Sequence, residues 1–499
     1  MGINLRLKLI CVITSICFIS SITAQEMAGL VHSNYAGTNV LFSNPAGLHH
    51  QKDWLSIHLV TTDVFFSNDY LYLDKDDFKF MDIFSGNLNI PQHPTGYSEG
   101  ERPFYIYERS SNTRFDLDLK IQGPSAMFIK KQHAFAVFTA ARSILHMRNI
   151  SPELGRVGYY GFGYDPQHDK IYQMENFNNT FITWAEVGLS YAYQWNRLLF
   201  NNWNFGISIR RLFGVGGTYL HVNNSDYNVI NDSTLDLATL ESNLAFSLPS
   251  NYNTDEFPTS PYINGNGWAF DLGVEYQELL DRQSKDGTTK ACGQRHWDYK
   301  YRIGVSLMDF GWIKFKNNAQ LHEYTNTDYT WHRIDSTKYE SWNQLMNEVS
   351  YRFYGDPNAS LKNTQFTMWL PTSLNIQADY NFENGIYMNG SFVYNFPFNG
   401  SFVRKPSILS LTPRYEKPNL EVSIPLSLYQ WKYPRIGLAL RLYYFTIGSD
   451  YFTSLMGWHD FNGMDLYFSI KINIRKGSCE KRNKINPCGD ALNKFPWSK

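Results

Sequence analysis

The chain has 499 residues, a formal net charge of −1 and a mean hydropathy of −0.39. The near-neutral charge argues against a nucleic-acid partner, and beyond the N-terminal segment no apolar run is long enough for a membrane helix. The chain is nevertheless rich in aromatic residues, with 34 Tyr, 35 Phe and 13 Trp. This combination is typical of a transmembrane β-barrel, in which half of each strand is polar.

The N-terminus predicts an export signal. Arg6 and Lys8 form a basic start, residues 9–22 are apolar, and Thr23-Ala24 precede a cleavage site at Gln25. The alternative is a membrane anchor, but about 14 apolar residues are short for a spanning helix. We therefore expect residues 1–24 to be a signal peptide.

Residues 25–52 precede the first expected strand and contain the motif Asn44-Pro45-Ala46-Gly47-Leu48. An ordinary turn is one interpretation, because Asn-Pro favours turns. His49 and His50 follow directly, and adjacent imidazoles can bind a metal. A solvated pair is the simpler interpretation, since no Cys or carboxylate lies nearby at a ligand spacing.

Alternation of apolar and polar residues with period two recurs through residues 53–474. It predicts about 14 strands of a single antiparallel barrel, of which the strand at 443–449 is weak. The candidate strands are 54–66, 124–131, 134–147, 185–194, 203–210, 268–276, 301–307, 374–382, 386–396, 404–415, 420–428, 434–442, 443–449 and 466–474.

The hairpin at 374–396 has the clearest pattern. Both strands place even-numbered residues on the apolar face, so facing residues sum to an even number and the loop has an odd length. A three-residue loop, Glu383-Asn384-Gly385, satisfies this and puts Gly385 where a left-handed backbone is favoured. We expect Ile376 to face lipid and Asp379 to face the lumen.

A soluble β-sandwich also alternates, so other features must decide between the two folds. Aromatic residues gather at strand ends, the strands exceed the usual five or six residues, and short connections alternate with long ones. The long connections are 67–123, 148–181, 216–266 and 310–365. Together these features favour a membrane barrel with short turns at one end and long loops at the other.

The polar faces of the strands carry charges of both signs. If the apolar faces meet lipid, these charges point into the lumen: Glu186, Arg210, Asp271, Glu275, Arg302, Asp379, Arg414, Arg441 and Lys471. A network of mutual pairs around a plug is one interpretation, because buried ions need partners. A polar path is the other, although selective pores usually show rings of one sign.

The tail at 475–499 follows the last strand. Cys479 and Cys488 flank a short polar segment, and a disulfide between them is one expectation, with two unpaired thiols as the other. The tail itself is interpreted either as a disordered extension or as a periplasmic docking knob.

Asn44-Pro45-Ala46, placed directly before the first strand, resembles the long-chain fatty-acid transporter (FadL-like) superfamily of outer-membrane barrels. The resemblance implies that the N-terminal segment is a plug within the barrel and that these residues lie in the lumen. The segments 304–314 and 447–451 also resemble uncharacterised barrels related to the PorV-like subunits of type IX secretion. FadL-like proteins carry hydrophobic compounds laterally through a wall opening.

Two functions are therefore expected in the outer membrane of a Gram-negative bacterium. The first is a FadL-like channel for small hydrophobic or amphiphilic compounds. The second is a non-transporting barrel that serves as a subunit or scaffold of a secretion or assembly complex, with outer-membrane or periplasmic protein partners. No nucleophile motif, metal motif or dinucleotide loop is present, so we expect neither an enzyme nor a cofactor.

Overall fold

The structure is a computed structural model. It describes residues 27–80, 82, 90–94, 101–198, 201–254, 258, 260, 262–280, 298–334, 339–396, 403–404 and 407–474. The expected signal peptide, the tail at 475–499 and the expected Cys479–Cys488 disulfide lie outside these residues.

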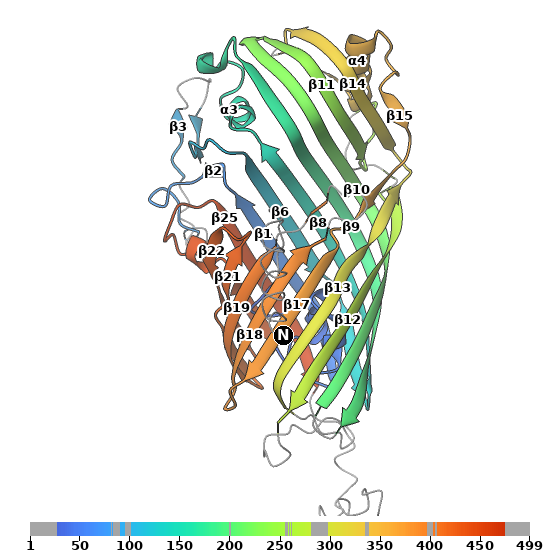
Figure 1. The fold of residues 1–499 in the computed structure, drawn as a ribbon, viewed down its shortest axis with the longest axis vertical. Coiled ribbons are helices and arrows are strands. Elements are labelled where there is room, and N and C mark those ends of the chain that lie inside the picture. The colour runs from blue at the N-terminus through green and yellow to red at the C-terminus, as the bar shows by residue number, and fades with distance from the viewer. Residues whose placement is uncertain are drawn as a thin grey trace, which may run out of the picture.

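The chain folds into a closed antiparallel barrel of 14 strands (Figure 1). β25 pairs with β1 and closes the wall. Some barrel strands consist of two segments. In order around the wall they are β1 (Leu55–Asn68), β6 (Thr113–Gln122) with β7 (Ser125–Lys130), β8 (His133–Ile150), β9 (Ile171–Leu198), β10 (Asn201–Asn231), β12 (Gly265–Leu279), β13 (Tyr299–Phe315), β17 (Ser373–Asn381), β18 (Ile386–Asn395), β19 (Ile408–Lys417), β20 (Leu420–Ser423) with β21 (Leu426–Tyr429), β22 (Tyr433–Ile436) with β23 (Leu438–Leu442), β24 (Phe445–Ser449) and β25 (Gly463–Ile474).

Side chains alternate between lipid and lumen along these strands. In the β17–β18 hairpin, Ile376 on the outer face is 39% exposed, whereas Asp379 on the inner face is 2% exposed. Phe382 continues the strand pairing, since its N–H donates to the backbone oxygen of Ile386 at 2.9 Å. The loop therefore has the expected three residues, and Glu383, Asn384 and Gly385 all have positive φ. The expected fold class, a transmembrane antiparallel barrel with an N-terminal plug, is confirmed.

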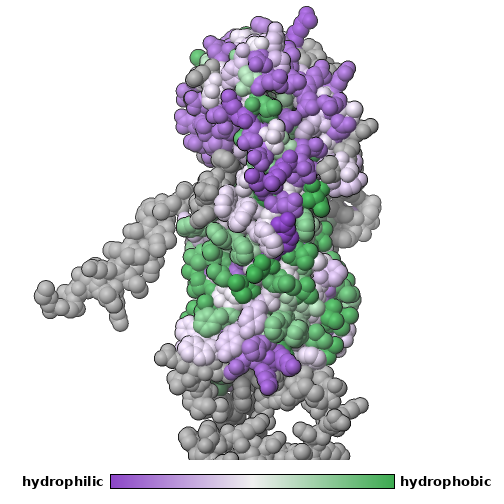
Figure 2. All heavy atoms as spheres, turned by 90° about the vertical axis from the view of Figure 1, so that its right-hand side faces the viewer, coloured by the Kyte–Doolittle hydropathy of each residue, from purple (hydrophilic) through white to green (hydrophobic). Residues whose placement is uncertain are grey.

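The outer surface carries an apolar belt below a hydrophilic upper part (Figure 2). The belt is formed by exposed residues of many strands, including Ile57, Ile121, Phe128, Val137, Leu189, Phe205, Leu272, Ile303, Ile376, Leu409 and Ile447. Its position matches the hydrocarbon layer that a barrel wall must cover. Among the described residues, no helix is long and apolar enough to span a membrane.

The long connections are more regular than the sequence indicated. β9 and β10, of 28 and 31 residues, continue above the belt, where β10 pairs with an added strand, β11. The other upper elements are β11 (Thr234–Ser247), β14 (Ala319–His332), β15 (Leu361–Asn363), β16 (Phe366–Trp369), α3 (Pro152–Tyr160), η3 (Asp165–Gln167), α4 (Trp342–Tyr354), α5 (Phe452–Leu455), and the short pairs β2 (Leu71–Tyr72) with β5 (Tyr105–Ile106) and β3 (His93–Pro94) with β4 (Glu101–Arg102).

The region 67–123 was also expected to be a connection, but it contains β6, a strand of the barrel wall, at residues 113–122. Asp116, Asp118 and Lys120 alternate along β6 and are buried on its lumenal face. The strand was not predicted, because a segment with so many charged residues resembles a solvated loop.

The N-terminal segment fills the lower lumen. It contains two short 3-10 helices, η1 (Gly37–Phe42) and η2 (Pro45–Leu48), and almost all of residues 27–53 are buried. We call residues 27–53 the plug. Above it, an apolar cluster of inward-facing side chains, including Trp184, Leu212, Ile313 and Phe315, occupies the upper barrel.

Candidate functional site

The plug rests on a patch of three glycines in the lumenal wall. Gly206 of β10 faces Gly273 of β12 across the strand pair, and Gly304 lies on the next strand, β13. A Cβ atom at Gly206 would lie 2.2 Å from the backbone nitrogen of Ala46, and one at Gly273 would lie 2.0 Å from Oδ1 of Asn44. Only glycine therefore permits this approach of plug and wall.

The plug motif is also a local turn. Asn44 caps η2, and its side chain accepts a hydrogen bond of 2.9 Å from the backbone nitrogen of Ala46. Pro45 occupies the first turn of this helix, where its missing N–H costs nothing. Asn44, Pro45, Ala46 and Gly47 are all buried in the lumen. The turn and the lumenal position, raised as alternatives by the sequence, therefore coexist.

An ion cluster ties the plug to β13, β17 and β19. The carboxylate of Asp379 accepts hydrogen bonds of 2.7 Å from both Arg302 and Arg414. Arg302 also donates to the backbone oxygen of His32, at 2.6 Å, and to the side chain of Asn34, at 3.2 Å. Plug and wall thus share one network, in which each buried ion has a partner of opposite sign.

A second cluster holds both ends of the plug to neighbouring strands. Glu416 accepts from the side chain of Asn34 at 2.9 Å and pairs with Lys52 at 3.4 Å. Glu421 pairs with Arg441 at 2.9 Å and accepts from the hydroxyl of Ser33 at 2.7 Å. These contacts leave no like-charged ring of the kind a selective pore would use.

Two buried plug histidines are held in the neutral form. Burial, aided by the nearby Arg302, lowers the pKa of His32 to about 3. Burial also lowers the pKa of His50, although its partner Glu275, at 2.9 Å, favours the charged form. His49 and His50 are both buried, so the expectation of a solvated pair was wrong.

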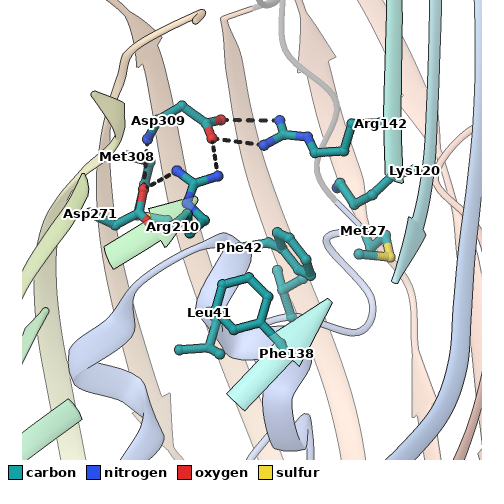
Figure 3. Close-up of a pocket in the computed structure, with 11 residues that line it drawn as sticks. Met27, Leu41, Phe42, Lys120, Phe138, Arg142, Arg210, Asp271, Met308 and Asp309 are labelled. Carbon is teal, nitrogen blue, oxygen red and sulfur yellow. Dashed lines mark hydrogen bonds and ion pairs between the residues drawn. The ribbon is translucent and has the colours of Figure 1, made fainter. Parts of the chain in front are cut away.

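A third cluster lies between the plug and the upper apolar core (Figure 3). Arg142 and Arg210 both reach Asp309, at 2.7 Å and 2.9 Å, and Arg210 also pairs with Asp271 at 2.6 Å and with Glu186 at 3.1 Å. The small cavity beside this cluster has a volume of about 10 Å³, no more than one water molecule fills.

The plug is apolar on its other side. Val40, Leu41 and Leu48 pack against the inner faces of β7 and β8, where Met127, Ile129, Ala134, Ala136 and Phe138 replace the usual polar residues. Figure 3 shows Leu41 and Phe42 turned toward Phe138. We call this contact the apolar seam. A second, smaller apolar contact joins Met27, Leu30 and Val31 of the plug to Ala439 and Tyr467 of the wall.

The barrel wall is irregular beside the seam. β6 and β7 pair with β8 in registers that differ by one residue, because Gly123 and Pro124 form a bulge between them. β1 bulges at the same level, between His58 and Val60. Pro124 cannot donate a ladder hydrogen bond, so the wall is interrupted here.

All nine charges that the sequence assigned to the lumen lie on buried inner positions: Glu186, Arg210, Asp271, Glu275, Arg302, Asp379, Arg414, Arg441 and Lys471. Sequence reasoning missed the glycine patch, Arg142, Asp309 and the apolar seam. The sequence could have indicated the glycine patch, since Gly273 and Gly304 occupy polar-face positions of strands with a clear alternating pattern.

A metal site is not built around the plug histidines. Among the described residues, the one group with suitable ligand geometry is Asp165, His168 and Asp232, on the surface of the upper loops. His168 already binds the backbone oxygen of Phe162 at 2.7 Å, which engages one of its ring nitrogens.

Comparison with known proteins assigns the family. The model of DUF5723, a family of unknown function, matches residues 59–450, so the chain belongs to that family. No curated protein shows significant sequence similarity to it.

Solved structures with some similarity include channels and transporters of hydrocarbons and a FadL homologue. A TodX deltaS2S3 mutant monoaromatic hydrocarbon channel has a TM-score of 0.43 and 10% identity over 88% of this chain and 95% of that chain. The Ralstonia pickettii toluene transporter TbuX has a TM-score of 0.36 and 9% identity over 88% and 94%. A Pseudomonas aeruginosa FadL homologue has a TM-score of 0.29 and 8% identity over 91% and 99%.

Proposed function

We propose that this member of the DUF5723 family is a FadL-like channel of a Gram-negative outer membrane, which carries small hydrophobic or amphiphilic compounds past its plug. The observation that carries the proposal is the apolar seam between plug and wall, which ends at the bulge around Gly123 and Pro124. An apolar compound crosses such a seam without displacing any ion from its partner.

The lumen is obstructed at two levels, which supports a gated route rather than an open pore. The upper barrel is filled by apolar side chains and the lower barrel by the plug. Separating apolar surfaces costs about 25 cal/mol per Å² of exposed area, and a hydrophobic substrate restores most of this by covering the same surfaces. Separating the buried ion pairs costs several kcal/mol and is restored by no hydrophobic substrate.

A disulfide that locks the seam tests the proposal. The hydroxyls of Thr38 in the plug and Ser125 in β7 lie 2.8 Å apart, so the double variant T38C/S125C places two thiols within bonding reach. We expect oxidation to lower the uptake of a fluorescent hydrophobic probe by about tenfold or more, because a seam held shut removes the passage, and reduction to restore it.

The matched control is S391C/S410C. These two serines face the lumen on β18 and β19, with hydroxyls 2.6 Å apart, and their disulfide joins wall to wall without touching the plug. Uptake that stays unchanged when the plug is locked and oxidised would contradict the channel.

The second candidate, a non-transporting scaffold, is favoured by a different observation. β9, β10, β11 and β14 rise well above the apolar belt and carry α4, which gives a large hydrophilic surface for a partner (Figure 2). Cross-linking in native membranes followed by purification tests this function. Recovery of the chain as a monomer without stable partners would rule it out.

A further inference from the structure

A large apolar pocket lies outside the barrel rather than in its lumen. It has a volume of about 480 Å³ and is lined almost entirely by apolar and aromatic groups. Its floor includes Phe115 of β6, Met147 of β8 and Phe177 of β9. These residues have the opposite parity to the buried lumenal residues of the same strands, such as Asp116, His146 and Thr180, so the floor is the outward face of the wall.

The roof of the pocket is α3, which lies above the upper ends of β6 and β8 (Figure 1). Leu154, Val157 and Gly158 of α3 reach the pocket, as does Tyr159. The helix packs closely on the connection that follows β1, because a Cβ atom at Gly155 would lie 2.6 Å from the ring of Tyr70. At Gly158, by contrast, a Cβ atom would meet nothing within 4 Å.

The pocket is continuous with the lipid-facing surface. Below it, Leu117 faces Leu145 and Phe115 faces Met147 across the β6–β8 pair, and Ile121 lower on β6 is 52% exposed. β1 runs 14 residues from Leu55, and a tilted strand crosses the hydrocarbon layer in about 9 to 11 residues, so its upper end reaches the head-group level. Phe66, near that end, packs edge-on against Phe115 of the pocket floor, with ring centres 5.3 Å apart.

The polar groups at the pocket are cationic. Arg102 and Arg114 both line it, and the guanidinium of Arg102 lies over the ring of Tyr159, 5.2 Å from its centre. Arg114 already pairs with Asp69 at 3.6 Å, whereas no carboxylate partner of Arg102 occurs among the described residues. A guanidinium at the rim of an apolar pocket matches an anionic head group joined to an alkyl chain.

We infer that this pocket binds an anionic lipid of the outer leaflet, with one acyl chain beneath α3 and its head group against Arg102. The lipid is held on the outside of the wall and does not pass through the lumen. The inference is therefore independent of whether the barrel transports anything.

The substitution Gly158→Leu tests the acyl-chain site. It fills the pocket from a position with free space, and it replaces a helical glycine, so the fold is preserved. The protein is embedded in nanodiscs of equal parts phosphatidylglycerol and phosphatidylcholine, extracted in mild detergent, and its retained lipid is counted by native mass spectrometry. We expect the unmodified chain to retain phosphatidylglycerol and G158L to retain about tenfold less, since losing burial of about two methylenes suffices for this.

Two further variants complete the experiment. Asn347→Leu adds the same side chain at an exposed position of α4, away from the pocket, and is expected to retain lipid normally. Arg102→Gln is expected to remove the preference for phosphatidylglycerol over phosphatidylcholine. Equal retention by G158L and the unmodified chain would overturn the inference. Retention of a single-chain probe, dodecyl phosphate, without retention of the diacyl lipid would also overturn it.

Discussion

The two sides of the plug are held by different forces. Toward β10, β12 and β13 the plug backbone sits on glycines. The plug is also bound by Arg302 of β13, which pairs with Asp379 of β17, and by the ion pair between Lys52 and Glu416 of β19. Toward β7 and β8 its contacts are mainly apolar, beside one hydroxyl pair between Thr38 and Ser125. Ion pairs and glycine contacts require one geometry, whereas apolar surfaces tolerate sliding. The polar side therefore anchors the plug, and the apolar side is where it can yield.

The largest expected effect is on the anchored side. Asp379→Ala leaves Arg302 and Arg414 without their shared carboxylate, and an uncompensated buried charge costs about 4 kcal/mol. We expect plug amides to exchange hydrogen far faster, as measured by mass spectrometry of residues 27–53. Glu323→Ala, which removes an exposed carboxylate of β14, is the control and should change nothing in the plug. Unaltered exchange in the Asp379 variant would show that the ion cluster does not anchor the plug.

Gly206→Leu is expected to have the next largest effect, about 3 kcal/mol, because its side chain overlaps the backbone of Pro45 and Ala46. The plug should lose protection while the barrel keeps its resistance to unfolding in detergent. Gly390→Leu is the matched control, since the nearest atom to its Cβ position is 4.0 Å away and the residue faces outward. Equal protection of the plug in the two variants would show that the glycine patch does not hold the plug.

On the yielding side, Leu41→Ala should cost about 2 kcal/mol through loss of buried apolar contact. In this variant the uptake of the fluorescent hydrophobic probe should rise, because the apolar seam is wider while the ion pairs on the other side of the plug are intact. Leu189→Ala, at a side chain that is 65% exposed on the lipid face, serves as the control. Reduced uptake in the Leu41 variant would contradict the assignment of the apolar seam as the side of the plug that yields.

Acid should loosen the plug by a smaller amount. The folded pKa of His32 is about 3, below the value of 6.5 for the exposed group, so its contribution is complete above pH 6.5 and declines as pH falls toward 3. At pH 5.5 the loss is about 1 kcal/mol. Protection of the plug amides, taken as the observed exchange rate relative to the intrinsic rate at the same pH, should therefore be lower at pH 5.5 than at pH 7.5, and His32→Asn should weaken this difference. A pH difference that is undiminished in the variant would assign it to other groups.

Much of the fold could be predicted from patterns within short stretches of sequence. The β17–β18 hairpin was predictable to its loop length, because alternation and turn chemistry act between near neighbours in the chain. β6 was not, since its lumenal Asp116, Asp118 and Lys120 resemble a solvated segment until the plug and opposite wall enclose them. The upper strands β11 and β14 were missed for a related reason: their pairing partners, not their own composition, make them strands.

The candidate site divides in the same way. Inward-facing charges followed from strand parity, but their partners did not, because Arg142 and Asp309 are distant in sequence and meet only across the lumen. The glycines that seat the plug lie on three strands, and nothing within any one strand marks them as a set.

The sequence by itself determined a two-faced wall of about fourteen strands and an N-terminal segment without a strand pattern, since alternation and strand length are properties of short stretches. Tertiary structure alone decided which side of that segment is held by ion pairs and glycine contacts and which by apolar packing. That decision depends on ion pairs, glycine contacts and a wall bulge, all of which come into being only when residues remote in the chain close around a common lumen.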